Sequence, residues 1–210
     1  MSKFETIFFD LDGTLCDSLE GISNSIRKSL STCGVNNPKE KMIQKMIGMP
    51  LSVSLKRNYF PKDKLLLEKA MKAFSHHYNE IGIFESKLYP GIKQLLSSLS
   101  QESRLIIITA KPTLLAKKVA KHHKIDTYFE SIKGQEFSSV HFSKFKMIKD
   151  SLPSGKSIMI GDKGSDILAG KKNKIYTAGV TYGYGKFKEL KKPDPDCIIK
   201  SVEDLEQLLL

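Results

Sequence analysis

The hydrophobic pattern of the chain alternates between short apolar runs and longer stretches with helical spacing. Four of the apolar runs contain β-branched residues, are four to six residues long and are bounded by Gly, Asp, Pro or Lys. They span residues 6–9, 104–109, 157–160 and 175–180. Short, continuously hydrophobic runs of this kind are typical of buried parallel strands.

Stretches with helical spacing follow these runs. They predict helices over residues 112–123, 143–152, 166–172 and 202–209. Because strands and helices alternate along the chain, we expect an α/β fold with a doubly wound parallel sheet and right-handed crossovers.

One interval departs from this alternation. Residues 17–85 contain only helix-like patterns, such as the apolar spacing of Ile22, Ile26 and Leu30. This interval follows the first predicted strand directly, so it predicts an α-helical domain inserted into the core. The expected boundaries are 1–15 and 87–210 for the α/β core domain and 16–86 for the helical domain.

Composition narrows the class of protein. The 210 residues, of which 40% are hydrophobic, suit a core domain with a smaller insertion. No run approaches the roughly 18 apolar residues of a membrane span, and the amino terminus lacks a signal-peptide pattern. We therefore expect a soluble, cytoplasmic protein. Three cysteines without metal-ligand spacing indicate neither a disulfide framework nor a zinc site.

The net charge of +11 is unusual and is compatible with a nucleic-acid partner, a membrane surface or anionic small molecules. The basic residues are scattered in short pairs such as Lys117-Lys118, Lys171-Lys172 and Lys191-Lys192. This distribution favours a lysine-rich solvated surface, with neither a nucleic acid nor a membrane as partner.

Acidic residues follow two of the predicted strands directly. Asp10 and Asp12 end the first strand, Asp162 and Asp166 follow the third, and Thr109 ends the second. Ligands of open parallel sheets bind beyond the carboxyl ends of the strands, so these side chains should converge. Four carboxylates repel one another, and a divalent cation offsets that repulsion; hard oxygen ligands favour Mg²⁺.

These residues resemble the four motifs of the haloacid dehalogenase superfamily of phosphatases. The matching features are FFDLDGTLCDS, the threonine at 109, a later lysine and GDKGSD, in the family order. Two longer segments, TAKPTLLAKKVAKHHKIDTYFESI and GVTYGYGKFKELKKPDPDCII, are similar to its phosphoglycolate phosphatase and 5'-nucleotidase-like members. The resemblance implies a Rossmann-like core and makes the helical insertion similar to the family's mobile cap.

The resemblance also implies catalytic roles. Asp10 would be the nucleophile that forms an aspartyl-phosphate, and Asp12 the general acid and base. Thr109 would hydrogen-bond the transferring phosphoryl group. Lys144 would neutralise the charge on the nucleophile and the phosphate, with Lys146 as the alternative lysine.

The implied Mg²⁺ site consists of the carboxylates of Asp10 and Asp162 and the backbone carbonyl of Asp12, which would bind the cation directly, and of Asp166, which would bind it through water or orient the direct ligands. The implied substrate-binding residues are Gly13, Thr109, Ala110 and Lys144.

Each assignment has a purely structural alternative. Asp12-Gly13 is a common turn signal, Asp166 is suited to a helix amino-terminal cap, and Thr109 could cap the following helix. Any exposed helix of this chain carries lysines, which is the structural alternative for Lys144. The chain also departs from the family pattern, because Lys163 follows Asp162 where an arginine-type residue is frequent.

Taken together, the residues and the resemblance predict a Mg²⁺-dependent phosphomonoester hydrolase that acts on a small phosphorylated metabolite and is similar to phosphoglycolate phosphatase. The alternatives are a 5'-nucleotidase-like phosphatase, a phosphomutase and a catalytically silent binding protein. Dehalogenases lack the acid at position 12, so Asp12 argues for phosphoryl transfer. Candidate substrates include 2-phosphoglycolate, nucleoside monophosphates, sugar phosphates and pyrophosphate. A homo-oligomer is left open, and Lys45, Gly48 and Arg57 are candidates for substrate selection by the helical domain.

Overall fold

The computed structural model describes residues 2–47, 51–135 and 143–210. The chain forms two compact units, which we call the core unit and the helical unit. The core unit comprises Met1–Asp17 and Lys87–Leu210, and the helical unit comprises Ser18–Ser86.

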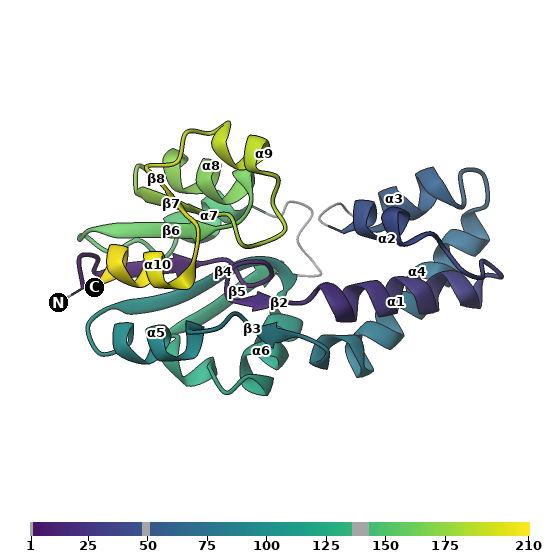
Figure 1. Ribbon diagram of the computed structural model, residues 1–210, viewed down its shortest axis with the longest axis horizontal. Helices are drawn as coiled ribbons and strands as arrows, with labels where there is room; N and C mark the ends of the chain where they lie inside the picture. Colours follow the sequence, from purple (N-terminus) through teal and green to yellow (C-terminus); the bar gives the residue numbers. More distant parts are fainter. Residues whose placement is uncertain (1, 48–50, 136–142) are drawn as a thin grey trace. The chain divides into compact units, whose positions relative to one another are not determined.

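The core unit is built on a six-stranded parallel sheet. Its strands are β1 (Thr6–Phe9), β4 (Arg104–Pro112), β5 (Ser131–Gln135), β6 (Ser157–Gly161), β7 (Tyr176–Val180) and β8 (Cys197–Ile199). They are arranged in the order β5-β4-β1-β6-β7-β8, so the first strand of the chain lies in the middle of the sheet (Figure 1). This arrangement confirms the doubly wound parallel sheet.

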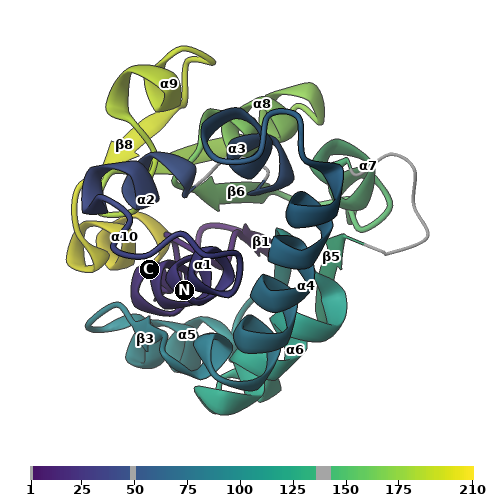
Figure 2. The same ribbon diagram turned by 90° about the vertical axis from the view of Figure 1, so that its right-hand side faces the viewer.

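Helices cover both faces of the sheet. They are α5 (Ile92–Leu99), α6 (Thr113–His122), α7 (Lys144–Lys149), α8 (Gly164–Lys172), α9 (Phe187–Lys191) and α10 (Val202–Leu209). Figures 1 and 2 show α7 and α8 on one side of the sheet and α5 and α6 on the other. A short antiparallel pair, β2 (Cys16–Asp17) with β3 (Lys87–Leu88), closes the end of the core unit where the chain leaves and returns.

Strand register explains the layer between the sheet and α7 with α8. Phe8 of β1 is paired with Ile106 of β4 on one side and Met159 of β6 on the other. These side chains therefore share one face of the sheet, and they pack with Ile148 of α7 and Ala169 of α8. The apolar residues between them point to the opposite face, which explains why the strands are hydrophobic throughout.

The helical unit has a core of its own. It contains α1 (Leu19–Thr32), α2 (Glu40–Met46), α3 (Leu51–Asn58), α4 (Lys64–Glu80) and a short 3₁₀ turn at Gly82–Phe84. Helices α1 and α4 pack against each other, and the Ser29 hydroxyl on α1 donates to the Ala70 carbonyl on α4 at 2.7 Å. Buried Ile26, Leu30 and Leu55 belong to the core that these helices enclose.

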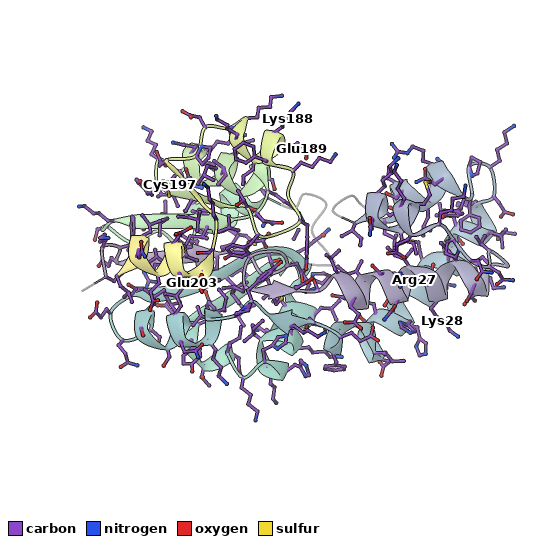
Figure 3. All side chains as sticks on the ribbon, in the orientation of Figure 1. Arg27, Lys28, Lys188, Glu189, Cys197 and Glu203 are labelled. Atoms are coloured by element: carbon purple, nitrogen blue, oxygen red, sulfur yellow. The ribbon has the colours of Figure 1, made fainter. Side chains whose placement is uncertain are left out.

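The surface carries many of the lysines that give the chain its charge. Lys28 on α1 and Lys188 on α9 are exposed and project from the surface (Figure 3). All three cysteines are free thiols, as the sequence predicts. Among the described residues no helix is both long and apolar enough to span a membrane.

Candidate active site

The carboxyl end of β1 places Asp10 at the centre of the sheet edge. Strand β1 runs between β4 and β6, and the Asp10 N–H donates to the Ile160 carbonyl of β6 at 2.9 Å. The Asp10 carboxylate accepts from the Leu11 N–H at 2.8 Å through Oδ1. Asp10 is only 3% exposed, so its carboxylate lies in a largely water-excluded place.

Two further carboxylates reach the same place from β6 and α8. Asp162 follows β6 directly, and Asp166 lies in the first turn of α8. One oxygen from each of Asp10, Asp162 and Asp166 lies within 4.8 Å of the others, and all three residues are buried. Three of the four predicted metal ligands are therefore close together.

Lys144 lies between two of these carboxylates. It is the first residue of α7, and its Nζ is 2.9 Å from Asp10 Oδ2 and 2.5 Å from Asp166 Oδ1. Its side chain is 7% exposed, whereas Lys146 is exposed on the same helix. Of the two lysines proposed from the sequence, Lys144 is the one that contacts the acidic cluster.

The two carboxylate oxygens of Asp162 differ in their hydrogen bonding. Its Oδ2 accepts from the backbone N–H groups of Tyr184 and Gly185 at 2.8 and 3.0 Å. Its Oδ1 is buried without a hydrogen-bond partner in the described part of the chain. A buried carboxylate oxygen left in this way is costly unless a ligand satisfies it. Together with the oxygen-only donor set, this oxygen fits a hard divalent cation such as Mg²⁺.

Burial and mutual repulsion shift the ionisation of the cluster. Burial, followed by the charge of Asp10, raises the pKa of Asp162 to about 6. Burial also raises the pKa of Asp166, against the opposing charge of Lys144. For Lys144, burial alone would lower the pKa, but the charges of Asp10 and Asp166 outweigh it and raise the pKa above its ordinary value. The lysine is thus held as an ammonium ion beside carboxylates that repel one another.

Asp12 has a basic partner that sequence reasoning missed. The Lys111 Nζ lies 2.8 Å from Asp12 Oδ2, and the two side chains are 5% and 18% exposed. The sequence offers no local signal for this pair, because lysine is abundant in the chain and the two residues are far apart in it. The position of Lys111, two residues after the candidate Thr109, was the one hint that the sequence provided. The expected contact of the Asp12 carbonyl with a metal stays a prediction.

Thr109 and Ala110 lie beyond the regular part of β4. The register of β4 with β5 shifts between Ile108 and Pro112, and Thr109 is buried in this irregular segment. Its hydroxyl accepts from the Lys111 N–H at 3.2 Å, and α6 begins only at Thr113. Thr109 therefore does not cap the helix, which was its structural alternative.

A pocket of about 260 Å³ opens onto the nucleophile candidate. Asp10, Ala110 and Lys144 line it, together with Phe145 and Lys163. Its size suits a small ligand, since pockets for drug-sized molecules are generally larger. Ala110 and Lys144, both predicted substrate-binding residues, thus line the same pocket as Asp10.

Position 13 packs so closely against Asp162 that only a glycine fits there. Its φ is +83°, and a Cβ added there would be 2.4 Å from Asp162 Oδ2 and 3.1 Å from the Tyr184 ring. A side chain at this position would displace Asp162. Its predicted contact with substrate stays a prediction.

Asp166 makes two contacts, one with the start of its own helix and one with the lysine of the acidic cluster. Its Oδ2 accepts from the Lys163 N–H at the start of α8 at 3.0 Å, while Oδ1 accepts from Lys144.

In the helical unit, Lys45 on α2 and Arg57 on α3 are exposed, and their role in substrate selection stays a prediction. Gly48, proposed with them, lies outside the described residues.

Comparison with known proteins identifies relatives over the whole length of the chain. The haloacid dehalogenase-like hydrolase family model matches residues 7–180. A 5'-nucleotidase of Pseudomonas aeruginosa is 30% identical, with 99% of this chain and 96% of that protein aligned. A phosphoglycolate phosphatase of Photobacterium profundum is also 30% identical, with 98% and 96% aligned.

Solved structures with the same fold are also similar to this chain. A Clostridium difficile protein matches with a TM-score of 0.91 at 33% identity, over 100% of both chains. A haloacid dehalogenase-like family hydrolase of Streptococcus pneumoniae matches with a TM-score of 0.85 at 32% identity, over 98% of this chain and 97% of that one.

Proposed function

The chain belongs to the haloacid dehalogenase-like hydrolase family and is a phosphatase, and we propose that it hydrolyses small phosphomonoesters with Mg²⁺ through an aspartyl-phosphate on Asp10. The observation that carries the proposal is the contact of one buried lysine with two carboxylates, 2.9 Å to Asp10 and 2.5 Å to Asp166, beside the unsatisfied oxygen of Asp162.

The charges of the cluster support a divalent cation. Four carboxylates, those of Asp10, Asp12, Asp162 and Asp166, are accompanied by the ammonium groups of Lys111 and Lys144. These groups carry one net negative charge when Asp12 is in its acid form and two when it is ionised, and Mg²⁺ would offset this negative charge in both states. Asp10, Asp162 and Asp166 would hold the cation, which when bound supplies electrostatic stabilisation of the phosphoryl oxygens.

Phosphoryl transfer begins with attack of an Asp10 carboxylate oxygen on phosphorus. The ester P–O bond breaks as the new bond forms, and Asp12 gives a proton to the departing oxygen. Lys144 and the Thr109 hydroxyl stabilise the negative charge of the phosphoryl group during transfer.

Hydrolysis of the aspartyl-phosphate completes the cycle. Asp12, now ionised, takes a proton from a water molecule, which attacks phosphorus and releases Asp10 as a carboxylate. The water proton thus restores the acid form of Asp12, and inorganic phosphate is the second product.

For the substrate, we propose a small phosphorylated metabolite of the kind that phosphoglycolate phosphatases use. The pocket of about 260 Å³ beside Asp10 supports a compact molecule. A nucleoside monophosphate is the second candidate, because one relative with 30% identity is named a 5'-nucleotidase. The proposed partner is this small phosphorylated substrate, with no role for a nucleic acid or a membrane.

The proposal is tested by phosphate release from 2-phosphoglycolate, nucleoside monophosphates, sugar phosphates and pyrophosphate, with Mg²⁺ and after chelation. Asp10→Asn should abolish turnover, because an amide cannot act as the nucleophile, while its shape preserves the fold. Lys146→Ala is the matched control on α7 and should retain activity, since Lys146 is exposed.

The best substrate by kcat/KM would identify the leaving group. Release that survives chelation, or ordinary turnover by Asp10→Asn, would contradict the proposal. Conversion of a sugar phosphate into its isomer without phosphate release would instead favour the phosphomutase alternative.

A further inference from the structure

Lys111 is a second buried cation at the site, and the mechanism above gives it no task. It is 9% exposed, and its side chain reaches Asp12 rather than solvent. Burying an ammonium group is costly unless a partner offsets the lost hydration. The ion pair of 2.8 Å to Asp12 Oδ2 provides that partner.

The backbone fixes the base of this side chain. The Lys111 N–H donates to the Thr109 hydroxyl at 3.2 Å. In addition, a Cβ added to Gly134 of β5 would lie 2.2 Å from the Lys111 carbonyl, so the two backbones are in close contact. A side chain that starts from so constrained a backbone can hold its partner in one orientation.

Asp12, by contrast, lies just beyond β1 in a turn that contains Gly13. A carboxylate on such a segment has several side-chain orientations, whereas a proton transfer requires one of them. The charge-assisted hydrogen bond from Lys111 selects that orientation.

We propose that Lys111 is a positioning residue that orients the Asp12 carboxyl for proton transfer to the leaving group. The inference rests on the proposed function, since it assumes that Asp12 acts as the general acid. Lys111 acts through Asp12 and is assigned no contact with the substrate.

The proposal has a specific kinetic consequence. An alkyl phosphate leaves as a strongly basic alkoxide and needs the proton from Asp12, whereas p-nitrophenyl phosphate leaves as a stable anion and hardly needs it. Loss of Lys111 should therefore slow alkyl phosphate hydrolysis far more than p-nitrophenyl phosphate hydrolysis.

The experiment compares kcat/KM for ethyl phosphate and p-nitrophenyl phosphate in wild type and Lys111→Met. This parameter includes the steps up to departure of the leaving group. We expect a loss of roughly a hundredfold or more with ethyl phosphate and less than about tenfold with p-nitrophenyl phosphate. Lys111→Arg, which keeps the charge and the hydrogen-bond donors, should recover part of the loss.

Two controls separate positioning from other roles. Lys118→Met removes an exposed lysine from α6 and should change neither substrate. In the Asp12→Asn background, Lys111→Met should add little, because residues that act through one another give non-additive effects. If Lys111→Met does not fold, Lys111→Gln allows the same comparison.

Equal losses for the two substrates would overturn the proposal and would indicate direct binding of the phosphoryl group. Full additivity with Asp12→Asn would overturn it as well. Wild type that releases phosphate from neither ester would contradict the proposed function itself, so the two failures are distinguishable.

Discussion

At the scale of single residues, the site depends on side chains that are buried together with opposite charges. Asp10 and Asp166 share one lysine, Asp12 has another, and Asp162 is held by two backbone N–H groups. Such groups are stable only as a set, because removing one leaves its partner buried and uncompensated.

Gly13→Ala tests how tightly this set is packed. The new methyl group would meet the Asp162 carboxylate at 2.4 Å on a backbone with φ of +83°. We expect the free energy of unfolding to fall by roughly 2–4 kcal/mol, from the unfavourable φ and the overpacking together, and phosphate release to fall with it.

Gly34→Ala is the matched control for this change. Its φ is +80°, but a Cβ added there meets nothing within 4 Å. It should cost only the conformational part, roughly 1–2 kcal/mol, and leave activity unchanged. Urea denaturation of both variants measures the difference; equal costs would show that Gly13 is not constrained by Asp162.

The sequence predicts the acidic residues of the site but not all of their partners. Asp10, Asp162 and Thr109 were identifiable because each ends or closely follows a predicted strand, and parallel strands bring their carboxyl ends together. Lys111 was not, because the chain contains 34 lysines and arginines and no sequence pattern marks this lysine as buried. Burial of a lysine is a property of the folded chain.

At the scale of elements, short strands carry the site and irregular segments complete it. The sequence predicts β1, β4, β6 and β7 because their apolar runs are continuous. It does not predict β5, whose residues SIKGQ are mixed, or the three-residue strand β8. Strand β4 also extends to Pro112, beyond the predicted end at 109, because β5 pairs with this irregular segment. These strands depend on neighbours far away in the sequence.

Asp196 shows how the edge strand β8 is anchored. Its Oδ2 accepts from the Thr177 N–H at 2.8 Å, and its Oδ1 lies 2.7 Å from the Lys171 Nζ. Burial raises the pKa of Asp196, but the hydrogen bonds from Lys171 and Thr177 outweigh it and lower the pKa below its usual 3.8. The carboxylate therefore stabilises the fold when it is ionised.

We predict that Asp196→Asn lowers the free energy of unfolding by roughly 1 kcal/mol near neutral pH, because the charge-assisted contact with Lys171 is lost. The difference from wild type should be complete above the unfolded-state pKa and should disappear as the pH falls through the lower folded-state pKa. Asp194→Asn, in the same loop, is the control. Chemical denaturation at neutral and acidic pH tests this, and a difference that grows in acid would contradict it.

At the scale of the whole molecule, the described residues of the core unit and of the helical unit each form hydrophobic packing of their own. One core lies between the sheet and its helices, and the other is enclosed by α1 to α4 of the helical unit. A unit with its own core can in principle fold alone. The role of the helical unit as a cap over the substrate stays a prediction from the resemblance.

The isolated fragment Ser18–Ser86 should therefore be helical by circular dichroism and unfold cooperatively. Leu30 is fully buried in its core, so Leu30→Ala should lower its stability by roughly 2–5 kcal/mol. Lys28→Ala, an exposed change on the same helix, should have little effect. A fragment without helical signal would show that this core requires the rest of the chain.

Detection of the covalent intermediate tests the role of Asp10 as nucleophile most directly. The protein is mixed with Mg²⁺ and its best phosphomonoester, quenched in acid within a single turnover, digested and analysed by mass spectrometry. We expect one phosphoryl group on the peptide that contains Asp10, and none in the Asp10→Asn variant. Phosphate release without a phosphorylated peptide, or a phosphoryl group on another residue, would contradict the assignment of Asp10 as the nucleophile.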